Sequence, residues 1–357
     1  MSSRSILSFY KVKLRATILL YSKYSRSYER IFSHLKTLFD TGVTLSHGGY
    51  PKLRATMIRL FPLSGAFLFA SCVLFGCAAQ SKPRATKAVP QEPKMAFEQD
   101  SKKLDEVSGI AQVRGRRDLF WVHNDSGDTA RMFVINDKGK LVLTVNLEGA
   151  NAFDWEDCDA QGGYVYAGDI GDNLSFRRDI QIYRFRVPKF DPKKKDQNIT
   201  LSKGQWEQTT LRYPDGAHNC ESLVATPDGR LLLVSKEESG TSRFYVWNTP
   251  WKNGASATLS KIGQWTWQGK DQFSKLATGA DISSDGRKLV VTTYTALYEF
   301  PLMTPFDFSS IRWVPTIQAL PAQKQCEAVC YSLDGRTIYS TGEGKKTPVW
   351  VLASRLP

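Results

Sequence analysis

The chain has 357 residues, of which 41% are hydrophobic and 12% aromatic, a composition typical of a globular protein and not of a disordered chain. Its formal net charge of +13 is concentrated near the start, because residues 1–56 hold ten Lys and Arg against Glu29 and Asp40. The rest of the chain carries only scattered basic residues and no clustered basic face, so we expect no nucleic-acid polymer as a partner.

A hydrophobic segment follows the basic stretch. Residues 57–76 begin with Met57, continue through an apolar run shorter than the ~20 residues of a membrane-spanning helix, and end in Leu-Phe-Gly before Cys77. This layout is typical of a secretory signal, and its ending resembles the lipobox of bacterial lipoproteins, whose Cys is lipidated. A plain signal peptide and a membrane anchor are the alternatives. We therefore predict an upstream extension at 1–56 that is not part of the fold, a lipoprotein signal peptide at 57–76 and lipidation of Cys77.

A lipid anchor attaches the mature protein to a membrane. We predict a location in the bacterial cell envelope, facing the periplasm or the cell surface. Ala78 follows the Cys in place of the Asp associated with inner-membrane retention, so the outer membrane is favoured. Residues 77–95 are rich in Pro, Ala, Lys and Gln, which predicts a tether. The folded body is predicted at 96–357, and we expect a monomer.

Export implies an oxidising compartment, and four cysteines remain after the signal: Cys158, Cys220, Cys326 and Cys330. On one strand, Cys326 and Cys330 would lie about 13 Å apart, too far for a disulfide. The other pairings stay open. No Cys-x-x-Cys spacing occurs, which disfavours a zinc site.

The body of the chain repeats one layout: an apolar strand, a turn of small residues, an apolar strand ending in polar residues, and a third strand. The repeats lie at 108–127, 156–172, 221–240, 278–294 and 327–344. Asp-Gly-Arg triplets begin at Asp228, Asp285 and Asp334, and they predict hairpin turns because Gly supplies the positive φ that such turns need.

Further strand-like runs complete the repeats. Fourth strands are predicted at 141–147, 205–213, 262–267 and 311–317. The last repeat lacks one, and residues 94–99 can supply it, which closes the ring and removes an exposed sheet edge. We predict an all-β fold, a five-bladed β-propeller. Six blades are the alternative, but a sixth would have to lie within 186–218, where the sequence shows none; two packed sheets are a further alternative.

Oxygen-bearing residues recur in register along these repeats. Counting seven residues back from the turn residues Gly115, Gly163, Asp228, Asp285 and Asp334 gives five positions, here called the ring residues: Ser108, Glu156, Glu221, Thr278 and Glu327. The first strand of each propeller blade lines the channel, so these side chains are expected to form a ring there, with Asp157 pointing to the opposite face of its strand.

Three Glu facing one another repel unless a cation lies among them. Calcium takes six to eight oxygen ligands, and sites without His or Cys suit calcium or magnesium better than zinc. We therefore predict calcium in the channel, with the ring residues as ligands. The alternative is a scaffold role, in which the acids accept hydrogen bonds from backbone N–H groups of neighbouring blades.

One repeat carries a family resemblance. Glu156 is followed by Val-Tyr-Ala-Gly-Asp-Ile-Gly at 165–171, similar to the Glu and the later Leu-Tyr-Val-Gly-Gly-Leu-Gly of the five-bladed calcium-activated nucleotidases (apyrases). The chain departs from that family at 124–127, where Asn-Asp-Ser-Gly lacks an Arg, and at Trp155, which precedes the Glu instead of following it. The resemblance implies a channel calcium held by the ring residues. The chain also resembles uncharacterised bacterial exported propellers with HNDSGD, DWED and GDIGDN runs.

Motifs of other enzyme classes are missing from the sequence. No P-loop, dinucleotide-binding glycine pattern or G-x-S-x-G elbow occurs. What remains is metal-assisted hydrolysis, with a carboxylate activating water. The catalytic candidates are acids at strand ends near the channel mouth, although such positions also favour Asp and Asn for local hydrogen bonds; they are Asp125, Asp169, Asp172, Glu237 and Glu343.

The sequence leaves open whether the protein is an enzyme. We favour an exported lipoprotein that binds an unidentified small-molecule or protein ligand. The alternative is a calcium-dependent phosphohydrolase acting on nucleotides or phosphate esters. A lactonase-like hydrolase is a third hypothesis, but it would need a His near the metal.

Overall fold

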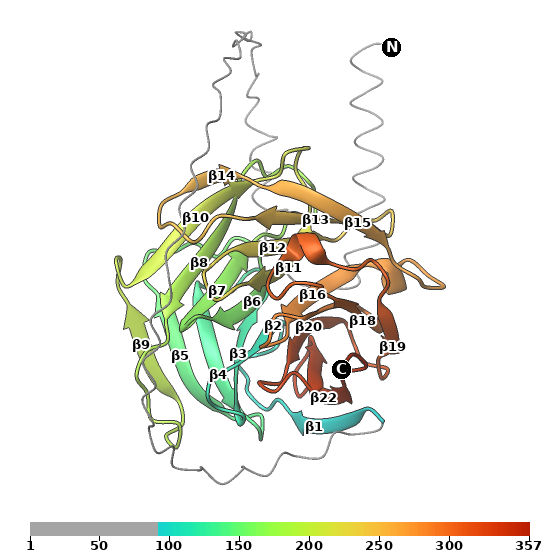
Figure 1. Ribbon diagram of the computed structural model, residues 1–357. Helices are drawn as coiled ribbons and strands as arrows, with labels where there is room; N and C mark the ends of the chain where they lie inside the picture. The colour runs from blue at the N-terminus through green and yellow to red at the C-terminus, as the bar shows by residue number, and fades with distance from the viewer. Residues whose placement is uncertain (1–91) are drawn as a thin grey trace, which may run out of the picture. The chain divides into compact units, whose positions relative to one another are not determined.

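The computed structural model describes residues 92–357, where the strands form five sheets arranged around one axis (Figure 1). The predicted signal peptide, the lipidation site and most of the tether lie outside these residues. No helix within 92–357 has the length and apolar character needed to cross a bilayer. The predicted five-bladed β-propeller is confirmed.

Each blade places its first strand at the channel. Blade 1 contains β2 (Val107–Gln112), β3 (Leu119–Asn124), β4 (Arg131–Asn136) and β5 (Leu141–Leu147). Blade 2 contains β6 (Trp155–Gln161), β7 (Tyr164–Asp169), β8 (Ile180–Arg186) and β10 (Trp206–Arg212). Blade 3 contains β11 (Cys220–Ala225), β12 (Leu231–Ser235), β13 (Thr241–Trp247) and β15 (Ser260–Thr266). Blade 4 contains β16 (Ala277–Ile282), β17 (Lys288–Thr293), β18 (Ala296–Pro301) and β19 (Thr316–Ala319).

Blade 5 is completed by the beginning of the folded body. It contains β20 (Cys326–Tyr331), β21 (Thr337–Gly342), β22 (Pro348–Ala353) and β1 (Lys94–Glu98). β1 pairs antiparallel with β22, as in Phe97 opposite Val349, so the predicted ring closure is confirmed. β1 begins at Lys94, just inside the range predicted as the tether.

Two short strands extend blades 1 and 2. β9 (Gln197–Leu201) pairs parallel with β5, and β14 (Ser256–Thr258) pairs parallel with β10. The stretch 186–218, where a sixth blade would have to lie, therefore supplies strands to two existing blades.

The predicted fourth strand of blade 4 is misplaced. Within 311–317, Ile311 forms only an isolated bridge with Leu302, and β19 begins at Thr316. Pro315 has no N–H to donate to a ladder, which explains why pairing starts after it.

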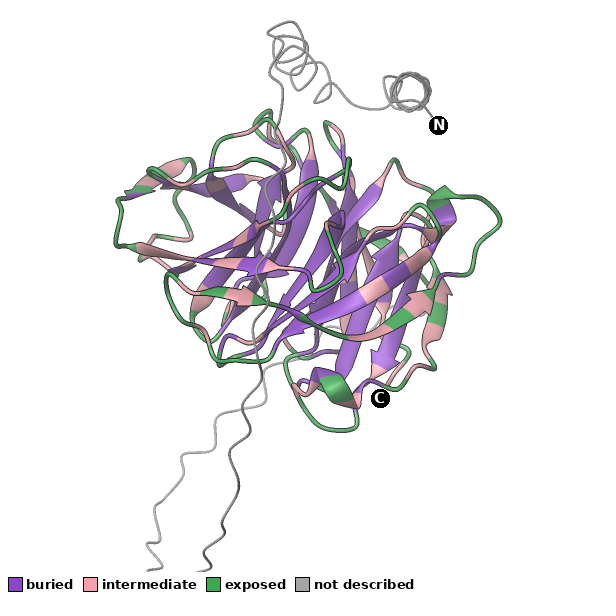
Figure 2. Cartoon of the chain, turned by 90° about the horizontal axis from the view of Figure 1, so that it is seen from above, coloured by how far each residue is buried: buried purple, intermediate pink, exposed green. Residues whose placement is uncertain are grey.

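Apolar side chains fill the space between blades. Trp121 of β3 packs edge-on against Phe185 of blade 2, with ring centroids 5.8 Å apart, and Trp265 packs against Phe300 of blade 4 at 5.5 Å. Buried residues run through the strands, and exposed residues lie mainly in the loops (Figure 2). Five such apolar clusters hold the blades together around the channel.

The turns and cysteines agree with the sequence analysis. The predicted hairpin glycines have positive φ, with values of 85° at Gly229, 72° at Gly286 and 65° at Gly335. All four described cysteines are free and buried, and Cys326 and Cys330 lie on β20 as assumed.

Candidate functional site

Every inner strand has a β-bulge at the same place, near the end of the channel where the inner strands begin. We call this end the channel mouth. In each blade the pairing of the first two strands skips one residue, and the skipped residues are Ser108, Glu156, Glu221, Thr278 and Glu327. These are the five ring residues, and all are buried. A bulge leaves its extra residue unpaired and redirects its side chain, so the fold gives these oxygens equivalent positions in all five blades.

The same bulge corrects the expected orientation of Asp157. Asp157 Oδ2 accepts hydrogen bonds from the backbone N–H of Leu223 in blade 3 (2.9 Å) and of Ala280 in blade 4 (3.2 Å). Asp157 therefore points into the channel, because the bulge at Glu156 interrupts the alternation of side chains along β6.

Carboxylates deeper in the channel also join blades. Asp159 Oδ2 accepts from the N–H of Ala225 at 2.8 Å, and Asp281 Oδ2 accepts from that of Tyr331 at 2.6 Å. The scaffold role considered as the alternative for the ring residues therefore applies to this deeper tier of carboxylates.

Two ring residues form hydrogen bonds with backbone carbonyl groups of a neighbouring blade. Ser108 Oγ donates a hydrogen bond to Glu156 O, and Thr278 Oγ1 donates one to Cys326 O, both at 2.7 Å. These hydroxyls connect β2 to β6 and β16 to β20. Each keeps lone pairs on its oxygen, but its proton is committed to holding the ring together.

Lys236 neutralises part of the ring. Its Nζ lies 2.9 Å from Glu221 Oε1 and donates to Tyr294 Oη at 2.9 Å, and Tyr294 in turn donates to Glu327 Oε1 at 3.1 Å. Burial alone would lower the pKa of Lys236, but Glu221 and its other acidic neighbours raise it well above its ordinary value. The side of the mouth with Glu221 and Glu327 therefore contains its own cation.

The remaining side of the mouth contains a group of three acids. Asp125 follows β3, Asp154 precedes β6, and Glu156 is the bulge residue. Each offers one oxygen that lies within 4.8 Å of those of the other two, and we call these residues the acid cluster. Calcium ligands at 2.3–2.6 Å place opposite oxygens up to about 5 Å apart. The acid cluster could therefore supply three of the six to eight oxygen ligands that a calcium ion takes.

A comparison of blades shows why the acids gather in blade 2. Two residues before the bulge, blades 3 and 5 carry amides that donate to their own bulge Glu: Asn219 to Glu221 at 3.1 Å and Gln325 to Glu327 at 3.4 Å. Blade 2 has Asp154 at this position. Glu156 thus faces a second carboxylate where its counterparts face an N–H donor.

The pKa values of the acid cluster reflect this arrangement. Burial, followed by the charge of Glu221, raises the pKa of Asp154 to about 7. Burial and neighbouring carboxylates raise the pKa of Asp125 and of Glu156 well above the ordinary range. Near neutral pH the acids therefore compete for protons, and a cation between them would replace those protons.

Gly171 makes room for the acid cluster. A Cβ built on it would overlap Glu156 Oε1 and Asp154 Oδ2. The backbone of Asp154 is held in place by Asp169, because the Asp154 N–H donates a hydrogen bond to Asp169 Oδ1 at 3.1 Å. Asp154 was missed as a candidate because the seven-residue count selects only one position per blade; its place two residues before Glu156 was the available signal.

The catalytic candidates separate into different environments. Asp125 belongs to the acid cluster. Glu343 lies near Glu327, and burial raises the pKa of both. Asp169 pairs with Arg177 at 2.9 Å, and Asp172 accepts from the Arg177 N–H at 2.6 Å, so both acids hold the loop after β7.

Glu237 does not belong to the acid cluster. It lies in a separate group on blade 3, paired with Arg243 and 3.2 Å from His218 Nδ1.

His123 is fully buried, its Nδ1 is 2.9 Å from Asn124 O, and burial lowers its pKa to about 4. His123 is therefore placed as a structural residue of blade 1.

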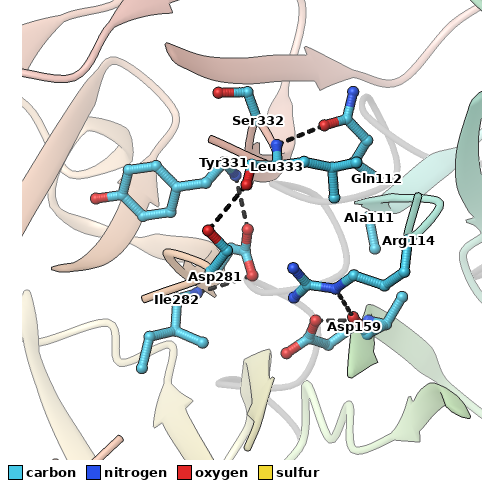
Figure 3. Close-up of a pocket in the computed structure, with 11 residues that line it drawn as sticks. Ala111, Gln112, Arg114, Asp159, Asp281, Ile282, Tyr331, Ser332 and Leu333 are labelled. Carbon is cyan, nitrogen blue, oxygen red and sulfur yellow. Dashed lines mark hydrogen bonds between the residues drawn. The ribbon is translucent and has the colours of Figure 1, made fainter. Parts of the chain in front are cut away.

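The opposite end of the channel contains a small cavity (Figure 3). Arg114, Asp159 and Asp281 surround a cavity of about 10 Å³, room for roughly one water molecule. Arg114 Nε donates to Ala160 O at 2.6 Å.

No protein-family model matches the chain, and no curated protein matches it. Among solved structures, it is similar to the PQQ-bound form of an aldose sugar dehydrogenase from Streptomyces coelicolor, at 12% identity and a TM-score of 0.42, over 75% of this chain and all of that chain. The similarity concerns architecture and does not indicate a shared activity.

Proposed function

We propose that this protein is a binding module in which the acid cluster holds calcium and so orders the channel mouth for an external ligand. One observation carries the proposal: blade 2 places Asp154 where blades 3 and 5 place amide donors. The proposed calcium ligands are Asp125, Asp154 and Glu156. Of the originally expected ring, Glu156 stays a ligand, whereas Glu221 and Glu327 are compensated through Lys236 and Tyr294.

Charge supports a cation at this position. The acid cluster is flanked by further acids, and Lys236 is already paired with Glu221 at 2.9 Å. Arg177 at the edge is paired with Asp169. The two nearest basic side chains are therefore committed to other acids, and a divalent cation supplies the missing positive charge.

The test is calorimetric titration of calcium into the purified protein and into Asp154→Asn, which gives blade 2 the kind of residue found in blades 3 and 5. Binding to the wild type and loss of binding in the variant support the proposal. Glu237→Gln, outside the acid cluster, is the control and should bind calcium as the wild type does. No binding to the wild type, or equal binding to Asp154→Asn, would contradict the proposal.

A calcium-dependent phosphohydrolase is the second candidate. The observation that favours it is the placement of Asp125 and Glu343 at the mouth, where burial raises the pKa of each carboxyl group above its ordinary value, as the pKa of a general acid often is. It predicts calcium-dependent phosphate release from ADP, ATP or p-nitrophenyl phosphate, lost in Glu343→Gln while calcium still binds. Calcium binding without phosphate release would leave only the binding module.

Anchoring to the cell envelope is proposed on the sequence alone, because Cys77 lies outside the described residues. Labelling cells with a palmitate analogue and fractionating their membranes tests it. The proposal expects label on the wild type and none on Cys77→Ala, with the wild type in the outer membrane. An unlabelled wild-type protein would contradict it.

A further inference from the structure

A groove opens beside the channel mouth on blade 2. Its volume is about 420 Å³, within the range of small-molecule sites. Phe153, Phe176 and Gln181 are among its lining residues. Phe153 directly precedes Asp154 of the acid cluster. The groove and the proposed calcium site therefore share a chain segment.

Two aromatic rings are presented in this groove. Phe153 is 51% exposed and Phe176 is 62% exposed. Neither belongs to the inter-blade core. Grouped exposed aromatic residues are a common mark of a binding surface.

The charged groups of the groove cancel in pairs. Asp169 pairs with Arg177 at 2.9 Å, and Asp179 pairs with Arg212 outside the groove. Arg177 also donates to Gly171 O at 2.7 Å and lies over the Phe153 ring at 5.0 Å. The groove thus offers aromatic faces without an excess charge to attract an ion.

Neutral polar groups accompany the rings. The amide side chains of Asn151 and Gln181 line the groove. A purely apolar ligand would remove these amides from water without replacing their hydrogen bonds, which costs free energy. A charged ligand would find no unpaired counter-charge. The lining therefore suits a neutral ligand with an apolar face and hydrogen-bonding groups at its edge.

We propose that this groove binds a neutral saccharide, whose C–H face stacks on Phe153 and Phe176 while its hydroxyls bond to Asn151 and Gln181. The inference rests on the proposed function in that it names the ligand class of the binding module. Asp169 connects the two sites, since it lines the groove and accepts from the N–H of Asp154 at 3.1 Å.

The test is saturation-transfer NMR of maltotriose, cellotriose and triacetylchitotriose with the purified full-length protein in excess calcium. At least one trisaccharide is expected to bind, with saturation strongest at ring C–H protons. Phe176→Ala should weaken binding about tenfold or more, because it removes one stacking surface. Leu174→Ala is the matched control: this side chain is 42% exposed in the same loop but does not line the groove.

Failure of all three sugars to bind, or equal binding to Phe176→Ala, overturns the saccharide proposal. The melting temperature of the same samples in calcium and in chelator separates this result from failure of the calcium proposal. A calcium shift without sugar binding overturns only the groove assignment. Sugar binding without a calcium shift supports the groove and contradicts the calcium site.

Discussion

Asp154 and Glu156 present carboxylate oxygens within 4.8 Å of one another at the start of β6. In blades 3 and 5 the residue equivalent to Asp154 is an amide that donates to the bulge Glu. Two carboxylates at this distance raise each other's pKa. When both are ionised and no cation lies between them, their repulsion destabilises the folded protein. The predictions below depend on this relationship.

Asp154→Asn should stabilise the calcium-free protein while abolishing calcium binding. The amide can donate to Glu156 as Asn219 does to Glu221, and it removes one repelling charge. We expect a gain of about 1 kcal/mol, or ~2–4 °C in melting temperature for a domain of this size. Thermal unfolding in chelator measures it, and a lower melting temperature for the variant would count against the account.

Gly171→Ala should disturb the acid cluster directly. The new Cβ would overlap oxygens of both Glu156 and Asp154, and overpacking of this kind typically costs about 1–3 kcal/mol. Calcium affinity should fall together with stability. Gly168→Ala is the matched control, because the three atoms nearest to its Cβ would all belong to the Ile170 side chain, at 3.1 Å or more. Similar calcium affinity in the two variants would contradict the prediction.

The stability of the calcium-free protein should fall as pH rises. The pKa of Asp154 is raised from 3.8 to about 7, so the folded protein binds more protons than the unfolded chain between those values. Stability contributed by the protonated acid is full below pH 3.8 and lost as pH rises through about 7. Burial and neighbouring carboxylates also raise the pKa of Asp125 and of Glu156, so their contributions to stability change with pH in the same direction.

Buried His123 works in the opposite direction at lower pH. Its pKa falls from 6.5 to about 4 on folding, so the stability that the neutral imidazole contributes to the folded protein is lost as pH falls from 6.5 towards 4. Melting temperatures in chelator should therefore be compared between about pH 8.5 and 6.5, above the His123 window. A rise in melting temperature on acidification is expected, with a smaller rise in Asp154→Asn; a flat profile in the wild type would contradict the assigned pKa directions.

Asp157→Ala should destabilise the fold itself. The carboxylate accepts hydrogen bonds from the N–H groups of Cys158, Leu223 and Ala280. Leaving such buried donors unpaired costs roughly 1–3 kcal/mol each, so we expect a loss of about 3 kcal/mol or more by urea unfolding. Asp191→Ala, in an exposed loop, is the control. Equal stability of the two variants would mean that Asp157 does not join the blades.

Much of the fold follows from short-range patterns. The Asp-Gly-Arg turns fixed three of the hairpins. The seven-residue count from the five turns reached all five bulge residues because each inner strand, of six or seven residues, has its bulge at its second residue. The misplaced strand of blade 4 reflects Pro315, whose missing N–H outweighed the apolar pattern of 311–317. Local patterns were therefore sufficient where turn chemistry set the register.

The site was less predictable because its chemistry arises between blades. The orientation of Asp157 depends on the bulge beside it, and a bulge is set by pairing, not by alternation of residue types. The ion pair between Lys236 and Glu221 joins a strand end to a bulge and has no motif of its own. A comparison of the positions before each bulge would have singled out Asp154 against Asn219 and Gln325.

An anomalous X-ray map of crystals grown with calcium would locate the ion. One peak bounded by Asp125, Asp154 and Glu156 is expected, and no such peak in Asp154→Asn crystals. A peak centred between Glu221 and Glu327, or no peak at the channel mouth, would contradict this expectation.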